Sequence, residues 1–308
     1  FTIFKKSSKY LDLLKKTNYL LWQANKKPIK INEEQILRRK VVSAIKYNKI
    51  ENKFNKLRKK LDVKKFKPAK GKLREFQLLL LDYMEEIISL LQEEGFSVFL
   101  DGGTLLGAVR HGGFIPWDDD IDIAVLGEDY EKVFEFLKSK FIYVDASEIT
   151  YNEFFFLVDK TIKLHPNQLF VLKTPDSIHI MKGESYEKYL KIDIFPYDYY
   201  DDNLTEDAFD NYRNKIKMQT ICNPVWRDII NVQKAEIEEN KVIVKKSNKI
   251  WYGLGNWAFT RFPFLGFRNE DDILPLSIIK FEGKYFPAPA KPESHISKTY
   301  KNIFSIPQ

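Results

Sequence analysis

Cysteine is almost absent from this chain. The 308 residues contain a single cysteine, Cys222. One thiol cannot form an internal disulfide and cannot build a cysteine-rich zinc site. The composition therefore favours a reducing compartment and excludes the small disulfide-stapled classes of protein.

Long apolar runs are missing as well. No stretch of 18 apolar residues occurs, so we expect no membrane-spanning helix. We also find no motif for a serine nucleophile, no internal repeat and no low-complexity tract. These absences predict a cytoplasmic protein, with peripheral attachment to the inner face of the cell membrane as a further expectation. The chain begins at Phe1 rather than at a methionine, so an upstream segment is left open.

The charges are distributed unevenly along the chain. Residues 1–74 hold 24 Lys/Arg and 5 Asp/Glu, whereas residues 75–308 hold 26 Lys/Arg and 38 Asp/Glu. The cationic segment is expected to meet an anionic surface, either membrane headgroups or a phosphate-rich polymer, and the alternative is a merely solvated lysine-rich surface. We expect no nucleic-acid partner, because the acidic remainder would be repelled and no nucleic-acid motif is present.

The domain organisation follows this charge division. Residues 1–66 show basic amphipathic patterns that predict helices, one of them running from Asn32 to about Leu61. Pro68 and Gly71 mark a linker. We therefore predict a basic helical appendage over residues 1–70 and a catalytic domain over residues 71–308.

Further elements of the second domain can be predicted from periodicity. Helices are expected over residues 73–94, 104–110, 128–140, 206–222 and 234–251, the first of them ending at Gly95. Strands are expected over residues 96–100, 121–125, 141–144, 154–158, 169–172, 178–181 and 189–195. The tail from Phe281 is expected to wrap the surface.

The most informative segment runs from Phe99 to Val125, with the sequence FLDGGTLLGAVRHGGFIPWDDDIDIAV. Asp120 and Asp122 stand two apart on a predicted strand, so both carboxylates point to the same face. Carboxylates held this close repel each other, and a divalent cation is the usual compensation. A glycine turn that lets backbone N–H groups approach a phosphate precedes them. The arrangement is typical of metal-dependent phosphoryl or nucleotidyl transfer.

Asp193 repeats this pattern in a later strand, flanked by Ile192 and Ile194. A lone carboxylate on an apolar strand needs a partner. If the two strands are neighbours, Asp193 becomes a third metal ligand; the alternative is an aspartate that caps the turn before Pro196.

These segments resemble the LicD family, which includes phosphocholine transferases and the fukutin-related proteins. The matching elements are Leu100–Gly107, Arg110-His111 and Ile115–Asp122. Two weaker ones are Asp193–Pro196 and the tail Phe281–Pro287 with Tyr300. The resemblance covers residues 72–302. It implies an α+β fold of the nucleotidyltransferase class, polymerase-β-type, in which a mixed sheet is flanked by helices.

The resemblance also implies an activity. Family members transfer a phosphoalcohol from a CDP-linked donor, CDP-choline in the expected case, to a hydroxyl of a cell-surface glycan such as teichoic acid or lipopolysaccharide, and CMP leaves. The acceptor would be a glycan or a lipid-linked glycan. Two alternatives stay open: a nucleotidyltransferase that uses an NTP, and a non-catalytic glycan-binding protein.

Roles for individual residues follow from chemistry and resemblance together. Asp120, Asp122 and Asp193 would hold one or two Mg²⁺ ions, with Mn²⁺ as an alternative. Asp193 or Asp118 would accept the proton of the attacking hydroxyl. The donor phosphates are expected to contact Gly102, Gly103, Thr104 and Arg110. The alternative prediction for Arg110 is a salt bridge to the acidic cluster.

The faces of aromatic side chains would hold a choline cation. The alternative interpretation of each aromatic candidate is that it packs in the hydrophobic core. The candidates are Trp117, Tyr197, Tyr199, Tyr200 and Trp226. His111 is interpreted as either a turn residue or a catalytic one. His165, His179 and His295 lack metal-ligand spacing and are interpreted as incidental.

Overall fold

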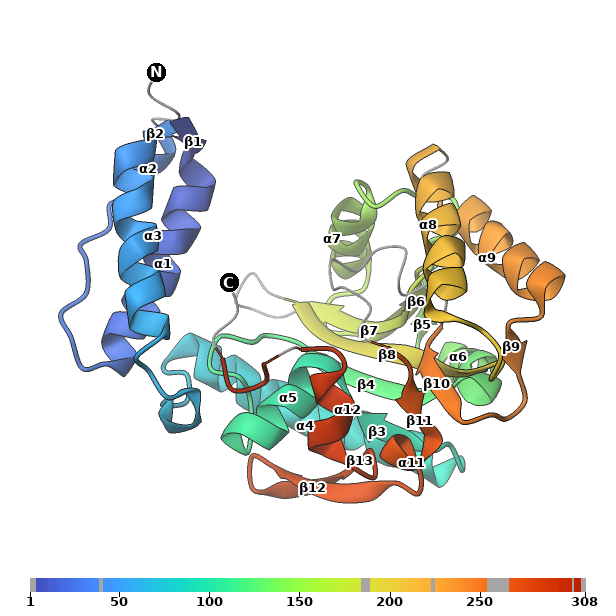
Figure 1. Cartoon of the computed structure of the whole chain (residues 1–308). Coiled ribbons are helices and arrows are strands. Elements are labelled where there is room, and N and C mark those ends of the chain that lie inside the picture. Colours follow the sequence, from blue (N-terminus) through green and yellow to red (C-terminus); the bar gives the residue numbers. More distant parts are fainter. Residues whose placement is uncertain are drawn as a thin grey trace. The chain divides into compact units, whose positions relative to one another are not determined.

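The computed structural model describes residues 4–38, 41–183, 189–222, 225–253, 266–300 and 302–305. The chain divides into two compact units (Figure 1). The first comprises residues 1–67 with 304–308, and the second comprises residues 68–303. None of the helices in the described ranges is both long and apolar enough to cross a lipid bilayer.

The first unit is mainly helical. Its elements are β1 (Phe4–Lys6), α1 (Ser7–Gln23), α2 (Glu33–Arg38), β2 (Val41–Ser43), α3 (Ala44–Arg58) and the 3₁₀ turn η1 (Val63–Lys65). Leu14, Leu20 and Leu21 of α1 and Phe54 and Leu57 of α3 are buried. Burial of these side chains between α1 and α3 supplies the core that a short helix needs to be stable in water.

A single helix from Asn32 to Leu61 was the prediction for this region, and it is wrong. Strand β2 separates α2 from α3 and pairs antiparallel with β1, Lys5 lying opposite Val42. Two consecutive β-branched residues, Val41 and Val42, favour a strand over a continuous helix.

The second unit holds the remaining elements. Its helices are α4 (Lys72–Glu93), α5 (Gly102–His111), α6 (Gly127–Lys140), α7 (Phe154–Leu164), α8 (Glu206–Cys222), α9 (Trp226–Asn240), α11 (Glu270–Ile273) and α12 (Pro292–Ser297). Its strands are β3 (Val98–Leu100), β4 (Ile121–Leu126), β5 (Ile142–Tyr143), β6 (Phe170–Lys173), β7 (Ile178–Gly183), β8 (Tyr189–Tyr200), β9 (Ile243–Val244), β10 (Lys249–Tyr252), β11 (Arg268–Asn269), β12 (Ser277–Phe281) and β13 (Lys284–Ala288).

Strand β8 joins most of the sheet together. It pairs parallel with β4 and antiparallel with β7, β9 and β10. Beyond these neighbours, β3 extends the sheet from β4, β6 and β5 extend it from β7, and β11 extends it from β10. The result is a mixed sheet with helices on both sides, so the predicted α+β fold class is confirmed (Figure 1).

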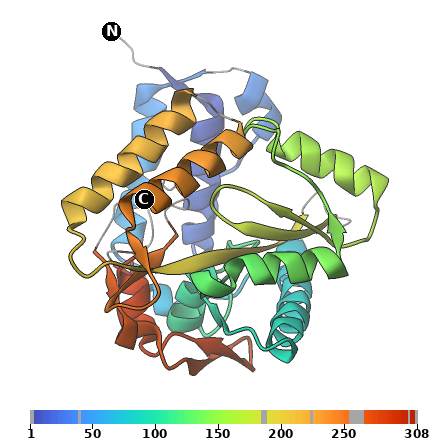
Figure 2. The same ribbon diagram turned by 90° about the vertical axis from the view of Figure 1, so that its right-hand side faces the viewer.

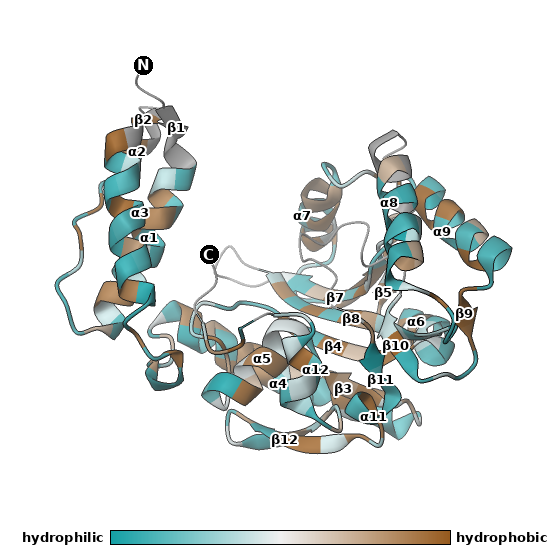
Figure 3. Ribbon diagram, viewed as in Figure 1, coloured by the Kyte–Doolittle hydropathy of each residue, from teal (hydrophilic) through white to brown (hydrophobic). Residues whose placement is uncertain are grey.

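The two faces of this sheet have different partners. Ile121, Ile123 and Ile194 are buried in one cluster with side chains of α4 and α6. A second cluster packs Phe170 and Met181 against residues of α7 and α9. Figure 2 shows β8 running across the unit with α9 on one side and α6 on the other, and Figure 3 shows β3 as mainly hydrophobic and much of α9 as hydrophilic. Because side chains alternate along a strand, Asp122 of β4 points to the face opposite Ile121 and Ile123.

Two predicted elements of this unit are wrong. Residues 154–158 form the start of helix α7 rather than a strand; the run of phenylalanines suggested a strand, but Val158 and Thr161 are buried at helical spacing. Residues 234–251 are not one helix, because α9 begins earlier, at Trp226, and ends where Lys241 adopts a left-handed conformation with φ of 48°. Residues 249–252 form strand β10.

The tail also differs from its prediction. Phe281 and Phe286 do not lie on the surface but are buried in the main cluster, carried by the β12–β13 hairpin. At the turn of this hairpin, Glu282 forms a bidentate ion pair with Arg74 of α4, at 2.8 and 2.6 Å. The hairpin therefore forms part of the core beside α4, and it does not merely wrap the surface of the unit.

Helix α4 provides a stability test with an internal control. Leu80 is fully buried, whereas Leu78 on the same helix is 42% exposed. We expect Leu80→Ala to lower the free energy of unfolding by about 2–5 kcal/mol, because the lost contacts leave a cavity. Leu78→Ala should change it by less than about 1 kcal/mol. Urea denaturation measures both, and equal losses would contradict this description of the core.

Candidate functional site

The parallel pairing of β4 with β8 brings the three predicted aspartates together. Asp122 lies directly opposite Asp193 in the register of the two strands. Asp120 precedes β4 by one residue, and one carboxylate oxygen from each of the three lies within 4.8 Å of the others. We call these three side chains the carboxylate triad.

The glycine turn lies against the triad. Helix α5 begins there, and the Gly103 N–H donates to Asp122 Oδ2 at 2.6 Å, while the Asp122 N–H donates to Thr104 Oγ1 at 2.8 Å. Gly102 has a φ of +48°, and a Cβ atom there would lie 2.4 Å from Asp122 Oδ2. A residue with a side chain could not occupy this position without displacing the carboxylate.

Mutual repulsion and burial act together on these carboxyl groups. Burial, followed by the charges of Asp120 and Asp193, raises the pKa of Asp122 well above its ordinary value. Burial also raises the pKa of Asp120. The pKa of Asp118 rises to about 7 through burial and through its neighbours Asp120 and Asp119. Placing several anions in one partly buried site is costly unless a cation compensates them.

Lys191 supplies part of that compensation. Its ammonium lies 2.9 Å from Asp193 Oδ2 and 3.3 Å from Asp120 Oδ2. The charge of Asp193 in turn raises the pKa of Lys191. Burial opposes ionisation of Asp193, but Lys191 and His179 outweigh it and lower the pKa of that carboxyl to about 2.

His179 is a site residue that sequence reasoning missed. Its Nδ1 donates to Asp193 Oδ1 at 2.7 Å, and its Nε2 lies 3.0 Å from Thr174 Oγ1 and 3.2 Å from Ser177 Oγ. The interpretation of His179 as incidental is therefore wrong. No spacing rule could find it, because the antiparallel register of β7 with β8, which sets His179 opposite Asp193, decides the contact.

His295 was also interpreted as incidental, and it too contacts the site. It is fully buried, and its Nε2 lies 2.9 Å from Oδ1 of Asp101, the residue before the glycine turn. The Tyr197 hydroxyl donates to the other oxygen of Asp101 at 2.9 Å. Asp101 thus joins the start of α5 to β8 and α12, and its side chain does not cap the helix.

Most of the aromatic residues predicted to bind choline are buried in the core. Tyr197 and Trp226 are completely buried, and Tyr199 is 9% exposed with its hydroxyl bonded to Glu270. Tyr200 is also fully buried. Core positions leave these aromatic faces no room for a ligand, which corrects their assignment to choline binding. Trp117, which is only partly buried, stays a candidate.

Arg110 is directed toward the C-terminal segment. It is buried, with NH1 donating to the Ile303 carbonyl at 3.3 Å and Nε donating to His111 Nε2 at 3.0 Å. These contacts favour a structural role over the predicted phosphate clamp. Burial and the charge of Arg110 lower the pKa of His111 to about 4, so that imidazole is neutral at neutral pH.

The acidic loop before β4, which carries Asp118, Asp119 and Asp120, is held by hydrogen bonds from a side chain of α4. The buried side chain of Gln77, on α4, donates to the Ile115 carbonyl at 3.2 Å and to the Asp118 carbonyl at 2.9 Å. Asp118 is therefore positioned beside the triad, while Asp119 in the same loop is exposed. Gly103 leaves room for the Asp118 carboxylate, since a Cβ atom there would lie 2.8 Å from its Oδ2.

The comparisons with known proteins agree with this geometry. Residues 95–227 match the family described as "LicD/FKTN/FKRP, nucleotidyltransferase domain". This segment of the chain, residues 95–227, is similar to a LicD-family nucleotidyltransferase domain. It contains the glycine turn, the acidic loop and all three members of the triad.

Individual relatives of the LicD-type domain match over short segments. The lipopolysaccharide cholinephosphotransferase LicD of Haemophilus influenzae is 47% identical over 60 residues, which are 20% of this chain and 23% of that protein. The human ribitol 5-phosphate transferase FKRP is 46% identical over 43 residues, or 14% of this chain and 9% of that protein. An uncharacterized protein of Rickettsia typhi, RT0683, is 33% identical over 109 residues, or 30% and 35% of the two chains. The chain therefore spans about a third or less of the length of these relatives.

The donor set of the LicD-type domain fits a hard divalent cation. Three carboxylates converge within ligand distance of one another, and a lysine ammonium already lies against two of them. Mg²⁺ and Mn²⁺ prefer oxygen ligands of this kind.

Lys191 should therefore compete with a divalent ion for the triad. We expect Lys191→Met to tighten Mn²⁺ binding, measured by calorimetry, on the order of tenfold, because it removes a positive charge beside the carboxylates. Lys182→Met is the control, since the Lys182 ammonium bonds the Tyr83 hydroxyl. Unchanged or weaker binding in Lys191→Met would contradict the placement of the ion.

The burial of His295 predicts a loss of stability in acid. Burial and the charge of Arg268 lower the pKa of His295 to about 4, below its ordinary 6.5. Between these values the unfolded chain binds a proton that the folded chain does not, so stability falls as the pH decreases, by up to about 1.4 kcal/mol per pH unit. His295→Gln, which keeps a donor toward Asp101, should flatten this dependence between pH 6.5 and 4 in urea titrations. An unchanged slope would show that other groups cause the acid sensitivity.

Proposed function

We propose that this protein transfers a phosphoalcohol from a CDP-linked donor to a hydroxyl of a glycan, with release of CMP. The observation that carries the proposal is the convergence of Asp120, Asp122 and Asp193 beside the glycine turn of a LicD-type domain. The named transferases among the relatives support the class of reaction, phosphocholine in one case and ribitol 5-phosphate in the other. Phosphocholine is the preferred head group, with CDP-choline as its donor.

The triad would hold one or two Mg²⁺ ions. When bound, Mg²⁺ neutralises the diphosphate of the donor and the charge that develops on the leaving CMP. His179 holds Asp193 in its ionised form through the bond from Nδ1, and this is the form that ligates a cation. The Gly103 N–H fixes the orientation of Asp122 in the same way.

The glycine turn would receive a phosphate of the donor. Helix α5 begins at Gly102, and a helix N-terminus offers N–H groups and a partial positive charge to an anion. The Asp101 side chain is engaged elsewhere and does not cap these groups. The Thr104 hydroxyl, which accepts from the Asp122 N–H, is one residue further along the same turn.

Asp118 is the candidate general base for the acceptor hydroxyl. It is positioned beside the triad by Gln77, and it forms no part of the triad itself. Asp193 was the other candidate, but its contacts with Lys191 and His179 suit a ligand better than a base. The acceptor would be a teichoic acid, a lipopolysaccharide or a lipid-linked precursor of such a glycan.

The basic first unit is proposed to hold the enzyme on an anionic surface, either the cell membrane or the acceptor polymer. Its excess of lysine over acidic residues supports this role. Peripheral attachment at the inner face of the membrane would bring the enzyme to lipid-linked acceptors.

The transferase proposal is tested by following CMP. The protein is incubated with Mg²⁺, a glycan acceptor and either CDP-choline or CDP-ribitol, and we expect acceptor-dependent CMP release. Asp122→Asn should lower the rate at least about a hundredfold while the fold is kept, since one ligand charge is lost. Asp119→Asn, in the exposed position of the same loop, is the matched control and should retain activity.

Other products would decide against the proposal. Release of pyrophosphate from CTP, without CMP from either CDP-alcohol, would identify a nucleotidyltransferase that uses an NTP. Near-parental rates in Asp122→Asn would remove the triad from the reaction. Absence of turnover and of divalent-ion binding would favour the glycan-binding alternative.

A further inference from the structure

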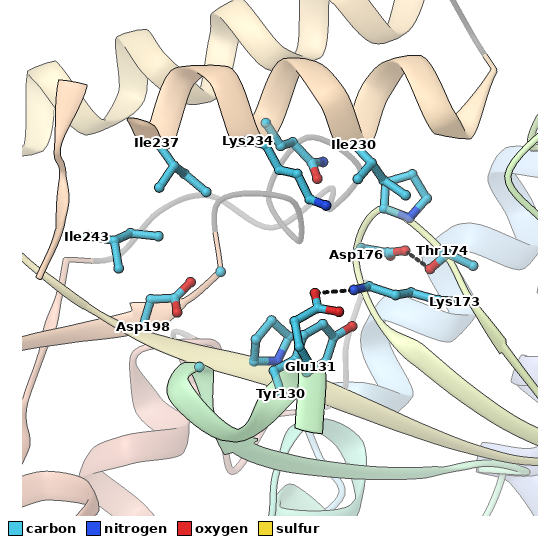
Figure 4. Close-up of a pocket in the computed structure, with 15 residues that line it drawn as sticks. Tyr130, Glu131, Lys173, Thr174, Asp176, Asp198, Ile230, Lys234, Ile237 and Ile243 are labelled. Carbon is cyan, nitrogen blue, oxygen red and sulfur yellow. Dashed lines mark hydrogen bonds and ion pairs between the residues drawn. The ribbon is translucent and has the colours of Figure 1, made fainter. Parts of the chain in front are cut away.

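The second unit contains a cavity that neighbours the site, because Thr174, one of the residues that line it, lies against His179. The cavity has a volume of about 200 Å³, and its walls come from the start of α6, the β6–β7 turn, β8, β9 and α9 (Figure 4). None of its lining residues belongs to the triad or to the glycine turn. The proposed transfer reaction leaves this cavity without a role.

One side of the cavity carries the carboxylate of Asp198. Within the described residues, no hydrogen bond or ion pair involves the Asp198 side chain, and burial alone raises its pKa to about 7. Two glycines make room for it: a Cβ atom at Gly127 would lie 1.8 Å from Asp198 Oδ1, and one at Gly253 would lie 3.2 Å from Oδ2. Asp176, bonded by the Thr174 hydroxyl at 2.5 Å, supplies a second carboxylate across the cavity from Asp198 (Figure 4).

The opposite side of the cavity presents hydrogen-bond donors. Figure 4 shows the Lys234 ammonium pointing from α9 into the cavity, with Asp198 to one side of it and Asp176 to the other. The Gln233 side chain on the same helix is 7% exposed, and its Nε2 is buried without an acceptor in the described part of the chain. A buried donor without a partner costs about 1–3 kcal/mol, so an anionic group placed there would be stabilised.

The two remaining charged side chains of the cavity, Lys173 and Glu131, compensate each other. Lys173 forms an ion pair with Glu131, and its ammonium also lies over the Tyr130 ring. Ile237 and Ile243 lie between Asp198 and Lys234, whereas Ile230 lies on the other side of Lys234 (Figure 4). The cavity thus offers an acceptor side, a donor side and an apolar stretch between them.

We propose that this cavity binds a small zwitterion, a molecule with an ammonium group at Asp198 and an anionic group at Lys234 and Gln233. A divalent metal fits less well, because these carboxylates do not converge as those of the triad do. A single anion or a single amine would leave one side of the cavity uncompensated. The apolar stretch suits a short methylene chain between the two charged ends.

A series of ω-amino acids tests the proposal by calorimetry on the full chain. The probes are β-alanine, 4-aminobutyrate and 6-aminohexanoate, with butylamine and butyrate as the two half-molecules. We expect one chain length to bind best, at least about tenfold more tightly than either half-molecule, because both charge-assisted contacts form only at the matching length.

Substitutions test which residues of the cavity bind the two charged ends of the amino acid. Asp198→Asn, which preserves shape, and Lys234→Met should each weaken binding of the best amino acid about tenfold or more. Lys245→Met, an exposed lysine outside the cavity, is the control and should bind as the parent does. Asp122→Asn should also bind normally, so this test is independent of the transferase proposal. Failure of all three amino acids to bind, equal affinity for butylamine, or parental affinity in Asp198→Asn would overturn it.

Discussion

The repulsion between carboxylates held on adjacent parallel strands is the constraint on which the site depends. The register that sets Asp122 opposite Asp193 is fixed by the backbone ladder of β4 and β8, and the isoleucines that alternate with these residues are buried on the other face. A shift by one residue would bury the carboxylates and expose the isoleucines. The free energy of the core therefore maintains an arrangement that the charges alone would oppose.

Elements distant in sequence offset this repulsion. Lys191 and His179 compensate Asp193, the Gly103 N–H binds Asp122, and Gln77 anchors the loop that carries Asp118. The start of α5 is tied to the C-terminal part of the chain through the bonds of Asp101 to Tyr197 and His295. The tail and β7 thus belong to the support of the site, although the LicD-type match ends at residue 227.

Sequence reasoning predicted what depends on local pattern. The helix before β3, the glycine turn and the alternation around Asp122 and Asp193 can be recognised within a few residues, and they lead to the α+β fold class. Contacts between distant segments could not be predicted in this way. His179, which the register of β7 with β8 sets opposite Asp193, and His295, which α12 places against Asp101, were therefore missed. The aromatic run at Phe154 was assigned to a strand because its helical spacing becomes clear only further along, at Val158 and Thr161. Tyr197 and Trp226 were proposed as ligand contacts because composition does not distinguish a core aromatic residue from an exposed one.

The central claim is that the triad holds a divalent cation. Anomalous diffraction from a crystal soaked with Mn²⁺ measures this directly, since the ion scatters where it binds. We expect a peak within coordination distance of carboxylate oxygens from Asp120, Asp122 and Asp193 together, with the Lys191 ammonium displaced from them. A peak elsewhere in the molecule, or none at the triad under saturating Mn²⁺, would contradict it.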